Sequence, residues 1–414
     1  MSSFSIPLSG LSATQQALNI ISNNLANLNT TGFKDQTANF QDLFYQHYGT
    51  TGSGNPIQIG AGTKIGSIAS NFTDGGLNNT GVPSDVAITG NGFFITQDAN
   101  GTITYTRAGD FGVNAAGQLV TADGQTVMGY PAVNGVVNQS SVLTPLVVGS
   151  AASPPVATTN MEQQTNLDAS AAVGTTYSAP LTVYDSLGSP HVLSFNYTKT
   201  GTGTWDYQVT LPAADTGGTG NPTVLASGTL TFDANGNLTS SAPVAVAITG
   251  LADGAADMNV QWNLADANGS SLLTQVDSPS ATTSTLQDGY SSGTLQSYMV
   301  DSDGVIEGQF SNGQVQAMGQ IALASFANPQ GLQLNGGSSY APTLASGAAV
   351  VGVPNSGIMG SVTGGALESS NVNISTEFTN LIVTQRAFQA DARMITTLDN
   401  VTNTTVNLQA SPGN

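Results

Sequence analysis

The chain has 414 residues, of which 39% are hydrophobic, and a formal net charge of −19 with only six basic residues. It is long enough for two or three domains of ~100–200 residues. It lacks the lysine and arginine surface that binding to nucleic acid or attachment to an anionic membrane requires. Only 7% of its residues are charged and 49 are glycine, a composition that favours strands joined by many turns. The absence of cysteine excludes disulfides, thiolate metal sites and cysteine nucleophiles.

The N-terminus has no basic region, no apolar run and no small-residue cleavage site, so no secretory signal is predicted. No stretch of the sequence approaches the ~18 apolar residues of a membrane span, so membrane anchoring is not expected. Phe4 and Leu8 form a short apolar pattern at this end of the chain.

The first helix is predicted over residues 8–29, with Gly32 as a stop signal. Its apolar residues repeat with the a/d period of a coiled-coil seam: Leu11, Leu18, Ile21, Leu25 and Leu28.

The middle of the chain is predicted to be all β. The tetrapeptide Asp-Ala-Asn-Gly occurs at residues 98–101, 233–236 and 266–269, and it supplies the Asx and positive-φ residues of tight hairpin turns. Apolar residues alternate with polar ones at 193–197, 205–211 and 244–248, which indicates strands with one buried face.

The boundaries of the β domains are predicted at two composition changes, near residues 150–155 and 279–287. The predicted fold class is α+β and multidomain, with a discontinuous helical terminal domain and two nested all-β domains. The expected parts are a helical domain at 1–30 and 370–414, connecting segments at 31–70 and 361–369, a β-rich middle domain at 71–145 and 285–360, and an inserted β domain at 146–284.

The sequence predicts no catalytic, cofactor-binding or metal-binding residue and no enzyme activity. Gly-Tyr-Ser-Ser-Gly at 289–293 fits a nucleophile elbow, but that motif needs a later histidine, and His47 and His191 both precede it. A Gly-rich turn is the better interpretation of that segment. Asp-Ser-Asp-Gly at 301–304 lacks the remaining ligands of a calcium loop, so a hairpin turn is expected there.

A second helix is predicted to begin near Ser375 and to continue the seam spacing. Its seam residues are Phe378, Leu381, Phe388, Ile395 and Leu398. Both predicted helices are crowded with Asn, Ser, Thr or Ile, residues of weak helix propensity, so we expect both ends to become ordered only when they bind partners. The alternative is a helical hairpin packed on its own domain.

The two ends resemble a known family. SGLSATQQALNIISNNLANLNTTGFK at 9–34 and SNVNISTEFTNLIVTQRAFQADARMITT at 370–397 are similar to the terminal signatures of flagellar rod, hook and hook-associated proteins. GNGFFI at 90–95 and YTRAGDF at 105–111 are shared by rod and hook proteins. VYDSLG at 183–188 followed by His191, DGYSSGTL at 288–295 and FSNGQVQAMGQIAL at 310–323 resemble the hook members of the family.

The resemblance implies a structural subunit that polymerises with itself into a flexible curved tube, the hook, which acts as a universal joint and transmits motor torque to the filament. It implies that the terminal helices line the central channel. The implied partners are the distal rod, the hook–filament junction proteins, the hook cap and the flagellar type III export apparatus, with no cofactor. The implied location is the cell exterior, reached without a cleaved signal peptide.

Three points remain open in the sequence. Phe4 and Leu8 either are read by the export gate or pack in the assembled tube. Residues 399–407 lack the larger apolar side chains usual in the family, which indicates looser packing there. A distal rod or hook-associated protein is the alternative within the family, and a secreted β-rich adhesin or glycan-binding module is the alternative from another class.

Overall fold

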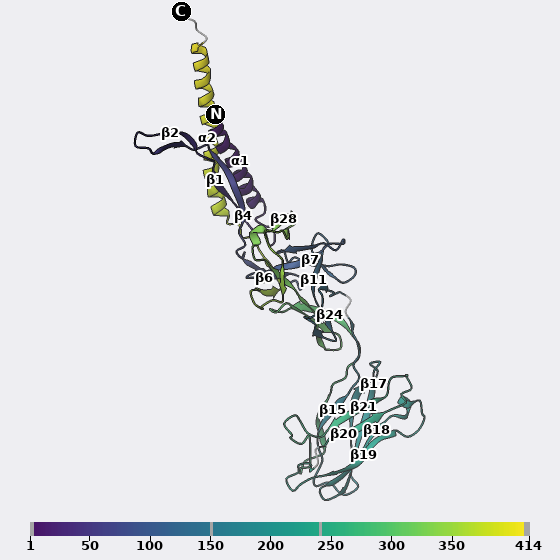
Figure 1. Ribbon diagram of the computed structural model, residues 1–414. Coiled ribbons are helices and arrows are strands. Elements are labelled where there is room, and N and C mark those ends of the chain that lie inside the picture. Colours follow the sequence, from purple (N-terminus) through teal and green to yellow (C-terminus); the bar gives the residue numbers. More distant parts are fainter. Residues whose placement is uncertain (1–3, 150–151, 240–241, 410–414) are drawn as a thin grey trace, which may run out of the picture. The chain divides into compact units, whose positions relative to one another are not determined.

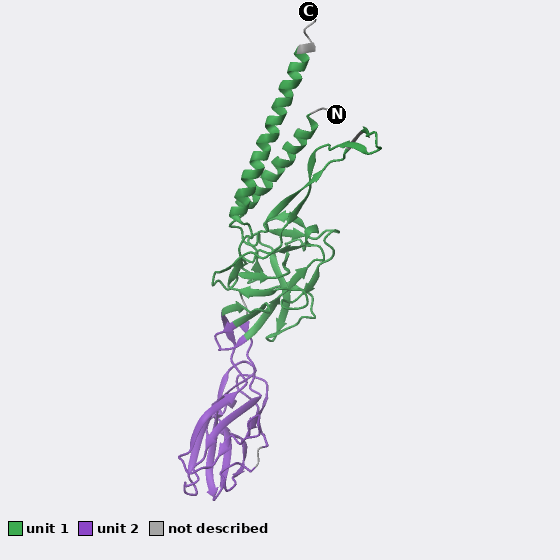
Figure 2. Cartoon of the chain, turned by 90° about the vertical axis from the view of Figure 1, so that its left-hand side faces the viewer, with its two compact units in different colours: residues 1–150, 297–308, 316–414 green, residues 151–296, 309–315 purple. Residues whose placement is uncertain are grey.

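A computed structural model describes residues 4–149, 152–239 and 242–409. The chain forms two compact units, each containing separated segments of the sequence (Figure 2). Unit 1 comprises residues 1–150, 297–308 and 316–414, and unit 2 comprises residues 151–296 and 309–315. The predicted fold class is confirmed, because one helix stands at each end of the chain and the described residues between them form strands and short 3-10 turns (Figure 1). The finer domain boundaries within unit 1 stay a prediction.

Unit 1 contains both α-helices, α1 (Ser5–Ala26) and α2 (Ile374–Gln409). Its strands before unit 2 are β1 (Gln36–Asp42), β2 (Gln46–Thr50), β3 (Pro56–Ile59), β4 (Thr63–Ser70), β5 (Leu77–Asn79), β6 (Val86–Thr89), β7 (Phe93–Gln97), β8 (Ile103–Thr106), β9 (Gly112–Val113), β10 (Leu119–Val120), β11 (Thr126–Val133), β12 (Val136–Val137) and β13 (Thr144–Pro145). Its later elements are β27 (Leu323–Ser325), η2 (Pro329–Gly331), β28 (Gln333–Gly336), β29 (Ser339–Ala341), β30 (Val350–Gly352), β31 (Ser361–Gly364) and β32 (Ala366–Glu368). Strands β24 (Gly293–Val300), β25 (Val305–Phe310) and β26 (Val315–Ile321) have residues in both units.

The core of unit 1 lies on both sides of β7. This strand pairs with β8, β11 and β27, so it is central in its sheet. Successive side chains of a strand point to opposite faces. Phe94 accordingly joins one buried apolar cluster with Val127, while Phe93 and Ile95 join another. A strand covered on both faces explains the unbroken apolar run of its sequence.

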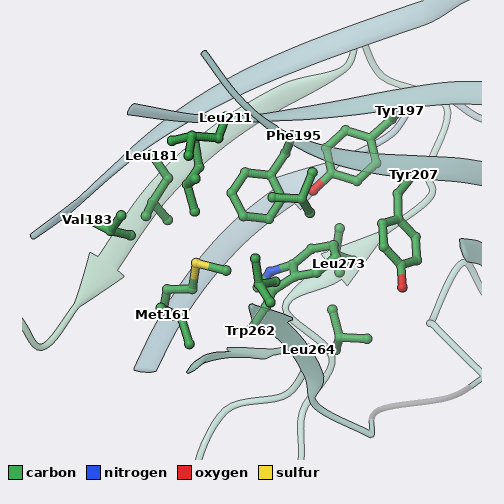
Figure 3. Packing of buried hydrophobic residues seen from close by; sticks show 14 of the residues in the cluster. Met161, Leu181, Val183, Phe195, Tyr197, Tyr207, Leu211, Trp262, Leu264 and Leu273 are labelled. Atoms are coloured by element: carbon green, nitrogen blue, oxygen red, sulfur yellow. The ribbon is translucent and has the colours of Figure 1, made fainter. Parts of the chain in front are cut away.

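Unit 2 contains β14 (Ala152–Ser153), β15 (Asn160–Asn166), β16 (Thr176–Tyr184), β17 (Pro190–Gly201), β18 (Thr204–Leu211), η1 (Ala213–Thr216), β19 (Thr223–Thr231), β20 (Val244–Ile248), β21 (Met258–Asn263), β22 (Leu273–Thr274) and β23 (Ala281–Gln287). Two sheets make up the unit, one with the order β16-β17-β18-β19 and one with the order β20-β21-β15-β22, in which β23 also pairs with β15. The alternating residues predicted to be buried lie in the core that both sheets share. One of them, Phe195, packs against Trp262 of the other sheet, with their ring centroids 4.9 Å apart (Figure 3).

The repeated tetrapeptide forms the turns expected of it. In each copy the first Asp accepts two backbone N–H bonds through Oδ1, as Asp233 does from Asn235 and Asn237 at 2.9 and 2.8 Å. In each copy the Gly has a positive φ, +81° at Gly236. These bonds stabilise the turn locally, which is why the motif can recur in both units.

The first helix differs from its prediction at both ends. It was expected over residues 8–29 but runs from Ser5 to Ala26, so Leu8 lies inside it and Leu28 lies beyond it. The chain leaves the helix at Asn27 and turns through Gly32, whose φ is +65°. A Cβ at Gly32 would lie 2.5 Å from the carbonyl carbon of Arg107, so only glycine fits this turn.

The second helix begins one residue before the predicted start. Asn373 caps it, since its Oδ1 accepts the backbone N–H of Thr376 at 3.1 Å. The capping residue is therefore two positions before Ser375.

Candidate assembly interface

The two helices lie side by side and run in opposite directions (Figures 1 and 2). The buried residues of α1 are Pro7, Ala13, Thr14, Ala17, Ile20, Ile21 and Asn24. Several of these side chains are small, which allows α2 and strands β1 and β4 to approach α1 closely. At Gly10 a Cβ would come within 2.9 Å of Asp391 Oδ2 on α2, so the helices nearly touch there.

The predicted seam residues are only partly covered in a single chain. On α1, Ile21 is buried, while Leu11, Leu18 and Leu25 are half-buried. Leu28, which follows the helix, is half-buried as well. On α2 four are half-buried: Leu381, Phe388, Ile395 and Leu398. Phe378 is 51% exposed. The structure thus brings the two helices together without enclosing their apolar side chains.

Further apolar side chains of α2 face solvent. The helix has 36 residues against 22 in α1, which corresponds to about 54 Å against about 33 Å at ~1.5 Å per residue. Every residue at positions 399–407 is exposed, including Val401 and Val406. Val383 and Met394 are also more than half exposed. Large exposed apolar patches are typical of interaction sites.

A ribbon of strands next to α1 adds to this surface. Strand β1 pairs with β4, and β2 with β3. Phe40 and Ile68 on this ribbon are more than half exposed, and Phe44 is 92% exposed. The side chain of Asn24, in α1, holds the ribbon in place by accepting the N–H of Gln36 at 3.0 Å and donating to its carbonyl at 2.8 Å.

A buried ionic cluster, here called the anchoring network, joins the segments next to the helices to the β part of unit 1. It consists of Lys34, Asp74, Arg107 and Glu368. Lys34 Nζ lies 2.6 Å from Glu368 Oε1, and Arg107 lies 3.4 Å from both Glu368 and Asp74. Glu368 also accepts the backbone N–H of Gly75 at 2.8 Å. Burial lowers the pKa of Lys34, and its hydrogen bond with Glu368 opposes that shift.

The anchoring network links the segment after α1 to the segment before α2. Lys34 follows α1 in sequence and Glu368 precedes α2, so their ion pair connects the end of one helix to the start of the other. Two of the six basic residues of the chain are buried around it. Sequence reasoning used Lys34 only as the end of a signature. The scarcity of basic residues was the one available signal that drew attention to Lys34 and Arg107.

Two further acids meet near the start of α2. Burial raises the pKa of Glu377, and the nearby charge of Asp35 raises it further against a hydrogen bond with Asn24. Burial likewise raises the pKa of Asp35, whose hydrogen bonds with Asn71 and Asn371 act in the opposite direction. Ionisation of either acid therefore opposes folding.

The predicted export residues lie at the start of α1. Phe4 is the residue before the first helical turn, and Leu8 is 57% exposed. Residues 289–293 include no helix, and Tyr290 instead bridges to Val156, so the nucleophile-elbow geometry is not formed. Among the described residues, neither helix is long and apolar enough to cross a membrane.

Four family models match the chain and together cover most of it. They are described as a flagella basal body rod protein (residues 6–34), the flagellar hook protein FlgE/F/G D1 domain (87–159), the flagellar basal body protein FlaE D2 domain (156–290) and the flagellar basal body rod FlgEFG protein C-terminal (363–408).

Curated relatives match over nearly the whole length. The flagellar hook protein FlgE of Escherichia coli is 37% identical, over 98% of this chain and 100% of the relative. That of Salmonella typhimurium is 38% identical with the same coverage, and that of Treponema pallidum is 33% identical over 97% and 98%. The crystal structure of Helicobacter pylori flagellar hook protein FlgE2 superposes with a TM-score of 0.52 at 16% identity, over 70% of this chain and 100% of that chain, which supports the fold.

Proposed function

The chain belongs to the flagellar hook protein family and is a structural subunit of the hook, and we propose that its terminal helix pair is the part that joins each subunit to its neighbours. The observation that carries this proposal is the set of apolar side chains on α1, α2 and the ribbon that one chain leaves exposed. The match to hook proteins along the whole chain, unit 2 included, favours the hook over the rod and over an adhesin.

Burial of these side chains would contribute favourable free energy to assembly. Full burial of one Val, Ile or Phe side chain stabilises by about 1.5–3 kcal/mol. Val383, Val401 and Val406 on α2 are each more than half exposed in one chain, and a neighbouring subunit can cover them. Several such contacts per subunit also offset the weak helix propensity of both ends. Contacts between different patches of identical subunits lead to open helical assemblies rather than closed dimers.

Self-polymerisation follows from membership of the family, whereas the mechanical role and the other partners are part of the proposal. We propose a curved tube that works as a universal joint and transmits torque. The small share of charged residues in the chain, 7%, supports this idea. Polar contacts through water can exchange at little cost as subunits slide past one another. The proposed partners are the distal rod, the junction proteins, the hook cap and the type III export apparatus, with the segment that includes Phe4 and Leu8 read during export.

The test separates folding from polymerisation. A chain lacking residues 1–30 and 370–414 retains Lys34 and Glu368 and should keep its β cores but form no tubes by negative-stain microscopy. The double variant Val383→Ser and Val401→Ser should raise the critical concentration for polymerisation at least tenfold. The matched control, Asn380→Ser and Gln389→Ser, alters exposed polar residues of the same helix and should polymerise normally. Tubes formed by the truncated chain, or equal effects of the two double variants, would contradict the proposal.

A further inference from the structure

Unit 2 holds a cluster of titratable side chains that the assembly interface does not use. Three carboxylates surround one imidazole, that of His191 at the start of β17. Its Nε2 lies 3.1 Å from Asp185 Oδ2 and 3.9 Å from Asp253 Oδ2, and its Nδ1 lies 3.2 Å from Asp215 Oδ2. The side chains of Asp185 and His191 are at least nine-tenths buried, whereas that of Asp253 is 32% exposed.

Three separate loops supply the acids. Asp185 lies in the turn between β16 and β17, Asp215 in η1 after β18, and Asp253 in the turn after β20. The first two loops belong to one sheet of unit 2 and the third to the other. A ligand bound by the cluster would therefore connect the two sheets.

Asp185 is fixed in position before any ligand arrives. Its Oδ1 accepts the backbone N–H groups of Leu187 and Ser189, both at 2.8 Å, which directs Oδ2 toward the imidazole.

The cluster has more negative charge than unit 2 can neutralise. Lys199 is the only Lys or Arg in residues 151–296 and 309–315. Its Nζ donates to the carbonyls of Asp168 and Ala169 and lies over the ring of Trp205. A protonated His191 would balance only one of its three carboxylates. A divalent cation would balance two.

We propose that Asp185, His191 and Asp253 bind a divalent transition-metal ion of the zinc class, with Asp215 as the residue that positions the imidazole. Zn²⁺ binds imidazole nitrogens and carboxylate oxygens, and sites with three protein ligands leave its fourth position to a solvent molecule. The three donor atoms lie within 4.8 Å of one another. Metal–ligand bonds of ~2.0–2.1 Å in a tetrahedron place donor atoms about 3.3–3.5 Å apart. His191 Nε2 and Asp185 Oδ2, which are 3.1 Å apart, are already close to that spacing. Asp253 Oδ2 lies 3.9 Å from Nε2, so a small movement of its exposed turn would complete the site.

Asp215 has the second feature of a metal site. A histidine that binds a metal through one nitrogen usually donates its other N–H to a carboxylate, which fixes the tautomer. Asp215 Oδ2 lies 3.2 Å from Nδ1, so with a metal ion on Nε2 the N–H at Nδ1 would face this carboxylate. The imidazole nitrogen also selects against Mg²⁺ and Ca²⁺, which prefer oxygen ligands.

The experiment uses the full-length chain without a histidine tag, treated with a chelator and then titrated with ZnCl₂ by calorimetry. We expect saturable binding of one ion per chain. We also expect Zn²⁺, but not Mg²⁺, to raise the unfolding midpoint of unit 2 by several degrees, as followed by fluorescence of its two buried tryptophans. Asp253→Asn should weaken binding at least tenfold, and Asp215→Asn by about 10–100-fold.

The control is Asp266→Asn, which removes the same charge from an exposed turn of unit 2 and should bind Zn²⁺ normally. Asp253 is partly exposed, so its variant tests the site even if His191→Gln does not fold. Absence of saturable binding, binding unaffected by Asp253→Asn, or equal stabilisation by Mg²⁺ would overturn the proposal. Tube formation is scored separately, because the site does not depend on the role proposed for the helices.

Discussion

The anchoring network gives the sharpest stability prediction, through the variant Glu368→Gln. The side chain of Glu368 is fully buried and lies against two buried cations, Lys34 and Arg107. The amide keeps a hydrogen-bond acceptor for Lys34 and for the N–H of Gly75, but it removes the charge that balances both cations. Asp74, the remaining acid, is 37% exposed and forms its ion pair with Arg107.

Removal of one partner from a buried ion pair costs about 3–5 kcal/mol. We expect about 3 kcal/mol, the lower end, because the hydrogen bonds at Oε1 can persist. For a domain of this size the loss corresponds to a fall in unfolding midpoint of about 6–12 °C. Burial lowers the pKa of Lys34, and the loss of Glu368 removes the main opposing interaction. A lysine with a lowered pKa destabilises the fold most below that pKa, so part of the lost stability should return as the pH rises toward the pKa of a free lysine.

The two units can be followed independently in one sample. Both tryptophans, Trp205 and Trp262, are buried in unit 2, so their fluorescence reports that unit alone. Both described α-helices belong to unit 1, so circular dichroism at the helix band reports unit 1. Glu368→Gln should shift the helix signal to lower temperature and leave the tryptophan transition unchanged.

The matched control is Glu307→Gln, which removes the same charge from a partly exposed position in unit 1. A Glu368→Gln midpoint no lower than that of the control would refute the reasoning. So would a variant in which Lys34→Met and Glu368→Gln together cost as much as the sum of the single changes, because paired groups should show coupling.

Two further predictions concern the other parts of the structure. The folded-state pKa of Glu377 is raised, so its ionisation opposes folding, and the thermal midpoint of the helix signal should be higher near pH 5 than at pH 7. Glu377→Gln should reduce that difference, and a pH profile unchanged by the variant would contradict the burial of this carboxyl. Phe195→Ala leaves a cavity beside Trp262 in the core of unit 2 and should lower the free energy of unfolding measured by tryptophan fluorescence by about 3–5 kcal/mol. The helix signal should not change, and an equal loss in both signals would show that the units unfold together.

Local pattern was sufficient to predict the elements but not the buried faces of the helices. The heptad of leucines predicted a helix, and a helix forms, because periodicity and local propensity act within a few residues. The residues that α1 buries in one chain include Ala13 and Ala17, which the seam pattern leaves out. The leucines stay half-buried. A hydrophobic pattern records all contacts of a residue, including those with other molecules, and does not say which ones form within the chain.

The anchoring network was beyond the reach of sequence reasoning for a different reason. Lys34 and Glu368 are 334 positions apart, and no local signal pairs them. The same holds for Asp215 and Asp253, which join His191 from separate loops, although VYDSLG with its following histidine was noticed as a motif. Turns, by contrast, were predictable because Asp233 and its copies satisfy the backbone within four residues.

Helix α1 packs against α2, which begins only at Ile374, so the helix pair can form only when the chain has been made almost to its end. A polypeptide that ends anywhere in the intervening 347 positions, from Asn27 to Asn373, would have α1 but lack α2. If it ends between Lys34 and Glu368, it would also lack the carboxylate that pairs with Lys34. Because the proposed interface needs both helices, such fragments would lack half of it and should not join the growing hook. The β parts lie between the two helices in sequence, so only a chain that continues through α2 would have the complete interface.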